Sequence, residues 1–218
     1  MNKRAWLLAF VVAASLLLST PASAGVLYDN GPINGNSTMG AWTINGGYAV
    51  ADSFTLTGTS TLTGVANAGL WLNPDDTPLS LDWGISASPN YTSSLGGGTV
   101  TLTLGPRCIS CGFGSYDIFA AGFSLPNLVL GPGTYYLSLQ NGVTSGSSYV
   151  YWDVNNGPSV AFDSAMGPVA DYGSSSGSNS SSFQILGDTS AVPEPASTAM
   201  FLSGLALVVG LARRKMHV

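Results

Sequence analysis

Two cysteines separated by two residues are the sharpest chemical feature of this sequence. Cys108 and Cys111 form a Cys-Ile-Ser-Cys stretch that Gly105-Pro106 precedes and Gly112 follows. A thioredoxin-like redox pair needs its first cysteine at the start of a helix that follows a strand, so these turn-forming neighbours favour a disulfide. Closing so short a loop contributes about 2 kcal/mol, which makes the predicted disulfide a local staple. Redox exchange by the same two thiols is the alternative.

The single histidine restricts the catalysis that the sequence allows. His217 lies near the C-terminus, beyond an apolar run and a basic cluster. The interior therefore has no imidazole to take a proton from a serine or cysteine nucleophile, or to hold zinc, copper or iron. We predict no catalytic residue, no metal ligand and no cofactor.

The aspartates leave two chemistries open. Glycoside hydrolysis needs two carboxyl groups about 5 to 10 Å apart, and the candidates are Asp52, Asp82, Asp153 and Asp163. Ca²⁺ prefers oxygen ligands, which two clusters offer, Asp75 with Asp76, and Asp153 with Asn155 and Asn156. Solvated turns, in which these side chains bond their own backbone, are the simpler interpretation of both clusters.

The aromatic residues outnumber what one core of this size requires. Trp152, beside Asp153 and Asn155, is the candidate for glycan contact. An indole face packs against the C–H face of a sugar, while neighbouring carboxylates and amides bond its hydroxyls. Trp83 alternates with polar residues and is predicted to lie in the core. A polysaccharide is therefore a candidate ligand, and core packing of all the tryptophans is the alternative.

Both ends of the chain have the features of targeting segments. Lys3 and Arg4, an apolar run over residues 5–18 and Ala22-Ser23-Ala24 predict a signal peptide over residues 1–24, cleaved between Ala24 and Gly25. At the other end, the 17 residues from Ala196 to Ala212 are just enough for a transmembrane helix. A basic cluster follows that helix and is expected to stay cytoplasmic.

The C-terminal tail, residues 193–218, resembles the sorting signal of the PEP-CTERM family. It has the Pro193-Glu194-Pro195 triplet, a short apolar helix, and the cluster Arg213-Arg214-Lys215, in that order. The resemblance implies export across the inner membrane of a Gram-negative bacterium, recognition by an exosortase, removal of the tail, and association with exopolysaccharide or biofilm. Stretches of the middle also resemble exported PEP-CTERM proteins, but they bring no catalytic residue. A plain C-terminal membrane anchor is the alternative.

The charge of the middle of the chain excludes one class of function. Residues 25–192 contain one basic residue, Arg107, and ten aspartates, which gives 1 − 10 = −9. Nucleic-acid binding needs clustered Lys and Arg to neutralise phosphates, so this class is excluded.

Period-two alternation predicts an all-β domain over residues 25–186. The apolar residues alternate with polar ones in the strands expected at 50–56, 79–86, 99–104 and 135–140. Weaker strands are expected at 26–28, 61–72, 117–123, 149–154 and 183–186, and turns at 45–47, 73–76, 96–98, 131–133 and 141–142. These elements favour an antiparallel β-sandwich of jelly-roll or immunoglobulin-like type, and a closed barrel is the alternative. Residues 173–182 are expected to form a flexible loop and residues 187–192 a linker.

The sequence therefore predicts an exported envelope or extracellular-matrix protein without catalytic activity. A secreted carbohydrate-active hydrolase that uses two aspartates is the rival interpretation.

Overall fold

The computed structural model describes residues 24–35, 40–89, 94–112, 115–164, 172–173 and 180–189. The predicted signal peptide up to Ser23 and the predicted sorting tail lie outside the described residues, and so does His217. Within the described ranges there is no helix that could span a bilayer.

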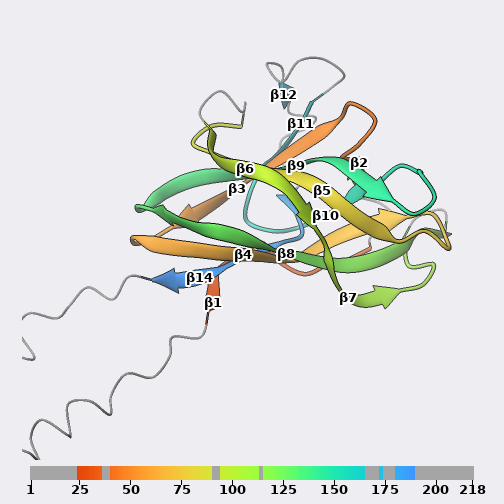
Figure 1. Ribbon diagram of the computed structural model, residues 1–218, viewed down its shortest axis with the longest axis horizontal. Coiled ribbons are helices and arrows are strands. Elements are labelled where there is room, and N and C mark those ends of the chain that lie inside the picture. The colour runs from red at the N-terminus through yellow and green to blue at the C-terminus, as the bar shows by residue number, and fades with distance from the viewer. Residues whose placement is uncertain are drawn as a thin grey trace, which may run out of the picture.

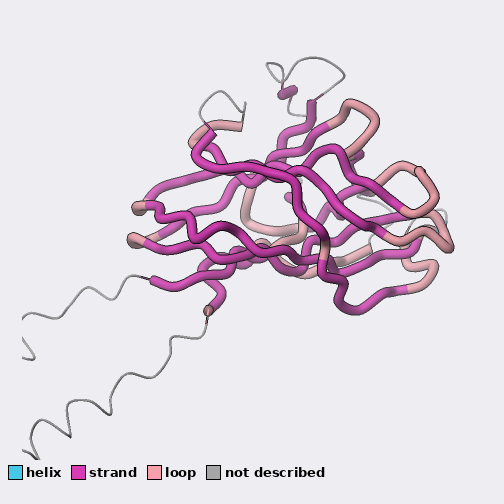
Figure 2. Tube along the Cα trace, viewed as in Figure 1, coloured by secondary structure: helices cyan, strands magenta, loops and turns pink. Residues whose placement is uncertain are grey.

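Fourteen strands build the described part of the chain, and strand covers most of its length (Figure 2). They are β1 (Gly25–Asp29), β2 (Ala41–Thr43), β3 (Ala49–Leu56), β4 (Ser60–Leu72), β5 (Pro78–Ser86), β6 (Ser94–Thr101), β7 (Thr103–Cys108), β8 (Asp117–Leu130), β9 (Gly133–Thr144), β10 (Tyr151–Asn155), β11 (Ala161–Ser164), β12 (Tyr172–Gly173), β13 (Ser180–Ser181) and β14 (Gln184–Thr189).

The strands form two antiparallel sheets that lie one above the other (Figure 1). The six-stranded sheet has the order β12-β11-β3-β9-β5-β6. The eight-stranded sheet has the order β1-β14-β4-β10-β13, with β8 also on β4, β7 on β8 and β2 on β10. The chain crosses between the sheets at Leu102, the one residue that separates β6 from β7. The predicted antiparallel β-sandwich is confirmed.

The hydrophobic core fills the space between the two sheets. Val50 and Phe54 of β3 and Leu137 and Leu139 of β9 all point into it and are buried, as their alternation predicts. Trp83 of β5 is 5% exposed and stacks on Phe123, which confirms its prediction as a core residue.

Two predicted turns are wrong because their glycines lie inside strands. Gly97, in the middle of the predicted turn at 96–98, belongs to β6, where an added Cβ would lie 3.0 Å from the carbonyl oxygen of Trp83. Gly142 belongs to β9, where an added Cβ would lie 3.0 Å from Cβ of Val150. At both positions glycine permits a close approach of the neighbouring chain.

The last part of the domain differs from the sequence prediction in two places. Ser180 and Ser181 form β13 and, with Ser182, are fully buried, so the predicted flexible loop does not include them. The predicted linker starts at Gly187, but β14 continues to Thr189 and pairs with β4 throughout. β14 also pairs with β1, so the first strand lies beside the last.

Candidate functional site

A buried polar cluster lies between β1, β3 and β13, and it consists of Asn30, Asp52, Ser159 and Ser181. Asn30 and Asp52 are fully buried. The Asn30 amide nitrogen donates hydrogen bonds to Asp52 Oδ2 (3.1 Å), Ser159 Oγ (2.6 Å) and the Ser181 carbonyl (2.7 Å). The Ser181 backbone N–H also donates to Asp52 Oδ2, and the Tyr28 hydroxyl donates to Asn30 Oδ1 (3.0 Å). The cluster therefore ties four distant segments together.

The Asp52 carboxyl is the most perturbed acid of this cluster. Burial raises its pKa to about 7, against the opposing effect of hydrogen bonds from Ser159, Ser181 and Asn30. Asp52 Oδ1 and Ser181 Oγ have no hydrogen-bond partner among the described residues. This structural role of Asp52 was not predicted. The signal for it in the sequence is that Asp52 shares the apolar face of its strand with Val50 and Phe54.

The residues predicted to contact glycan, Trp152, Asp153 and Asn155, are buried in β10, so this prediction is corrected. Trp152 faces the core, where its indole N–H donates to the Ser182 carbonyl (2.8 Å) and its ring packs on Phe183. A fully buried indole has no face to offer a sugar.

The chain segment 30–35 covers the other two of these residues on the opposite face of β10. The Asp153 carboxylate accepts the backbone N–H groups of Asn34 (3.1 Å) and Gly35 (3.2 Å). The Asn155 amide donates to the carbonyls of Asn30 (2.8 Å) and Pro32 (3.1 Å). Both side chains therefore hold the segment in place, and burial raises the pKa of Asp153 in spite of these bonds.

The four aspartates considered for glycoside hydrolysis do not form an accessible pair. Asp52 and Asp153 are fully buried. Asp163 lies diagonally across from Asp52 on the neighbouring strand, so burial of Asp52 rather than distance removes this pair. Asp82 lies on β5, where it accepts hydrogen bonds from Thr99 and Asn141, and Asp163 lies on β11. Two strands separate β5 from β11, which places these carboxyl groups roughly 14 Å apart at the usual strand spacing. Glycosidases need about 5 to 10 Å.

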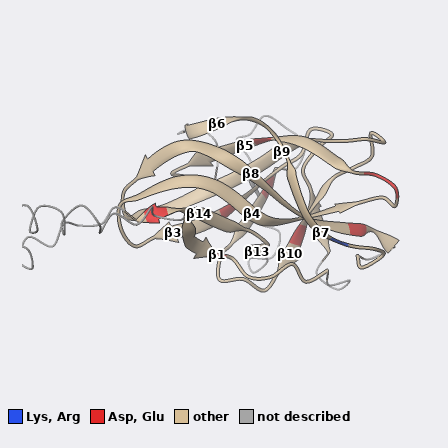
Figure 3. Ribbon diagram, turned by 60° about the horizontal axis from the view of Figure 1, so that its bottom comes forward, with Lys and Arg blue, Asp and Glu red and all other residues tan. Residues whose placement is uncertain are grey.

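The other predicted chemical residues lie at the surface. The sulfur atoms of Cys108 and Cys111 are at disulfide-bonding distance, with Cα atoms 5.7 Å apart, as predicted. Arg107, the one basic residue of the described chain, forms an ion pair with Asp117 beside them (Figure 3). Asp75 and Asp76 lie in a turn, and no three His, Cys, Asp or Glu side chains within the described ranges gather as metal ligands.

An open groove lined by aromatic rings lies at the start of β10, and we call it the tyrosine groove. Its rings follow one another from Trp71 to Tyr116 (centroids 6.3 Å apart), to Tyr151 (5.5 Å) and to Tyr149 (6.2 Å). Trp71, Tyr116 and Tyr151 line a cavity of about 220 Å³.

Tyr149 lines a second cavity of about 470 Å³, together with the polar residues Asn45, Asn73, Ser147 and Ser148. The contact between the Tyr149 and Tyr151 rings links this cavity to the first, and we include both in the tyrosine groove. The Tyr149 ring is 57% exposed. Burial and a hydrogen bond with Tyr116 raise the pKa of the neighbouring Tyr151 to about 12, so its hydroxyl stays protonated at neutral pH.

The comparisons with known proteins match one segment of the chain. Residues 191–215 match the family model described as the PEP-CTERM protein-sorting motif. No curated protein is significantly similar to the chain. The motif implies that the protein is exported to the cell envelope and processed by an exosortase, in agreement with the Pro193-Glu194-Pro195 triplet and the cluster Arg213-Arg214-Lys215. The chain therefore carries a PEP-CTERM protein-sorting motif at residues 191–215.

Proposed function

We propose that this protein is a non-catalytic component of the extracellular matrix that associates with exopolysaccharide after an exosortase has processed its tail. The sorting motif supports delivery to the outside of the cell. The β-sandwich is the part of the chain that remains there once the tail has been removed.

The burial of Asp52 and Asp153, together with the distance between the strands of Asp82 and Asp163, is the observation that carries the non-catalytic part of this proposal. Two of them are buried under other segments, and the other two lie on strands too far apart to act on one glycosidic bond. A carbohydrate-active enzyme needs a carboxyl pair in a groove. A binding or structural protein needs only a surface of suitable shape and chemistry.

The charge of the domain is compatible with a matrix of neutral sugars. Arg107 is the single basic residue of the described chain, and it is already paired with Asp117. Recognition of a strongly anionic polymer would need unpaired cations in a patch, as nucleic-acid binding does. We therefore propose a partner polysaccharide whose recognition depends on hydroxyl groups and ring faces.

Fractionation of the producing bacterium tests this function. We expect the processed protein in the exopolysaccharide fraction of wild-type cells, and in the culture medium of cells that make no exopolysaccharide. A Glu194→Ala variant, which alters the sorting motif, is expected to remain in the membrane fraction. Cytosolic protein, or equal release into the medium with and without the polysaccharide, would contradict the proposal.

A further inference from the structure

We propose that the tyrosine groove is the site that binds the polysaccharide. This inference rests on the proposed function and names the residues that bind the polysaccharide. The groove combines stacked aromatic rings with uncharged polar side chains, which is the chemistry that recognises a sugar chain.

The rings of the groove form one row because strand pairing places them on the same face. Tyr151 of β10 lies directly opposite Trp71 of β4, and paired residues of neighbouring strands point to the same side of a sheet. Tyr149 is two residues before Tyr151 and extends the row, with ring centroids 6.2 Å apart. Tyr116 closes the other side, edge-on to Tyr151. Trp71 is 3% exposed and forms the floor of the groove, so the rings that can contact a sugar chain are those of Tyr149, Tyr151 and Tyr116.

The groove is fixed before any ligand arrives. Gly46 has a φ of +64°, and an added Cβ there would lie 3.0 Å from the Tyr149 ring, so the ring rests directly on this turn. The Asn45 amide donates to the carbonyls of Gly142 (3.1 Å) and Ser148 (3.0 Å), which holds the loop that carries Tyr149. The Trp71 indole N–H donates to Asp153 (2.7 Å). Such preorganisation reduces the entropy lost on binding.

The polar residues of the groove are available to a ligand. The exposed side chains of Asn73 and Ser147 make no hydrogen bond to another described residue. They lie in the same cavity as Tyr149, where an amide and a hydroxyl can bond sugar hydroxyls while the ring contacts the sugar face. No charged residue lines either cavity, so the groove favours a neutral polymer over an ionic one.

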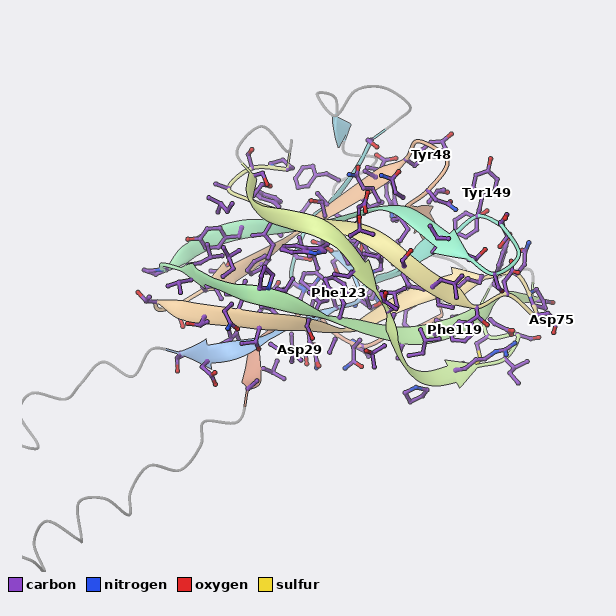
Figure 4. All side chains as sticks on the ribbon, viewed as in Figure 1. Asp29, Tyr48, Asp75, Phe119, Phe123 and Tyr149 are labelled. Carbon is purple, nitrogen blue, oxygen red and sulfur yellow. A yellow bond between two sulfur atoms is a disulfide. The ribbon has the colours of Figure 1, made fainter. Side chains whose placement is uncertain are left out.

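The groove also lies where an extracellular polymer can reach it. Figure 4 shows Tyr149 at one end of the long axis of the molecule, while β14, which leads to the sorting tail, points toward the other end. A domain held at the membrane by its tail would therefore present the groove outward until the tail is removed.

Affinity electrophoresis of the exported protein tests this site. The wild-type protein and its variants run through native gels that contain the exopolysaccharide of the producing cells, hydroxyethyl cellulose or dextran. We expect the cells' own polysaccharide to retard the wild-type protein. Tyr149→Ala should weaken binding roughly tenfold, as loss of an aromatic anchor does, and Asn73→Ala roughly fivefold, as loss of one hydrogen bond does.

The matched control is Tyr136→Ala, which removes a half-buried tyrosine that stacks on Phe162 outside the groove. It should bind as the wild-type protein does. Thermal unfolding of each variant shows whether it is folded, and Asn73→Ala, in an exposed turn, serves as the second test if Tyr149→Ala unfolds. Equal retardation of the wild type and both groove variants would overturn the site but leave the proposed function intact. If no polysaccharide retards the wild-type protein, both the site and the proposed function are overturned.

Discussion

Tyr151 and Trp152 are neighbours on β10, yet they belong to two regions with opposite properties. Trp152 lies next to the buried polar cluster and is fully buried, while Tyr151 is half-buried in the tyrosine groove. Both regions combine aromatic rings with amides and hydroxyls. They differ because the segment 30–35 and the serines 180–182 satisfy most of the polar groups of the buried region from within the chain. Composition alone therefore does not distinguish a structural polar cluster from a binding surface.

The largest difference between the two regions should come from removing one aromatic ring in each. Trp152→Ala is expected to lower the free energy of unfolding by about 4 kcal/mol, because it leaves a core cavity and an unpaired Ser182 carbonyl. Tyr149→Ala should change it by about 0.5 kcal/mol or less, because that ring is exposed. Urea titrations of the two variants measure both values, and similar losses would contradict the distinction.

A second contrast lies in how pH acts on the buried cluster. The pKa of Asp52 is raised to about 7 in the folded protein, from an ordinary value of 3.8. Between these two values the folded state holds a proton that the unfolded state has lost, so stability should fall as pH rises from about 4 to 7. The full difference corresponds to about 4 kcal/mol as an upper bound.

The pKa of Asp153 is also raised, so Asp153 likewise lowers the stability of the protein as pH rises. The Asp52→Asn variant separates the contribution of Asp52 from that of Asp153. Denaturation of the wild type and the variant at pH 4.5 and pH 8 should show a smaller loss of stability in the variant. The same pH slope in both proteins would show that Asp52 is already ionised in the folded state.

A third test concerns how tightly the buried region is closed. An added Cβ at Gly157 would lie 2.1 Å from the carbonyl oxygen of Asn30, whereas nothing lies within 4 Å of one at Gly58. Gly157→Ala should therefore cost about 3 kcal/mol, as overpacking against rigid backbone does. Gly58→Ala is the matched control and should be close to neutral. Equal midpoints of unfolding for the two variants would argue that the segment 30–35 is loosely held.

The smallest effect is expected at Cys108 and Cys111, outside both regions. Their link closes a short loop at the surface, so changing both to serine should lower stability by about 2 kcal/mol without affecting polysaccharide binding. A reducing agent should produce the same loss in the wild-type protein and none in the double variant. A change in retardation by the polysaccharide would connect this loop to the groove, which we do not expect.

The sequence was sufficient for the sandwich because several of its strands, such as β5 and β9, alternate for part of their length between apolar and polar residues. Trp83 and Leu137 could be placed in the core on that basis alone. The sequence was not sufficient to place Trp152. Its polar neighbours suggested an exposed position, but whether they face solvent depends on segments that are distant in the chain. Asn34 and Ser182 contribute to the burial of β10 from about 120 and 30 residues away.

The groove could not be predicted for the same reason. Tyr149 and Tyr151 are visible as a pair in the sequence, but Trp71, Tyr116 and Asn73 join them only through the pairing of β10 with β4 and the position of the following turns. No local pattern relates these positions. A contact between strands of large sequence separation is needed to recognise them as one surface.

Intact mass spectrometry of the protein isolated from the extracellular matrix tests most directly whether it is exported and processed. We expect a polypeptide that begins at Gly25 and ends near Pro193, without the cluster Arg213-Arg214-Lys215. A mass that still includes this cluster would contradict exosortase processing and would indicate that the domain is simply anchored by its tail.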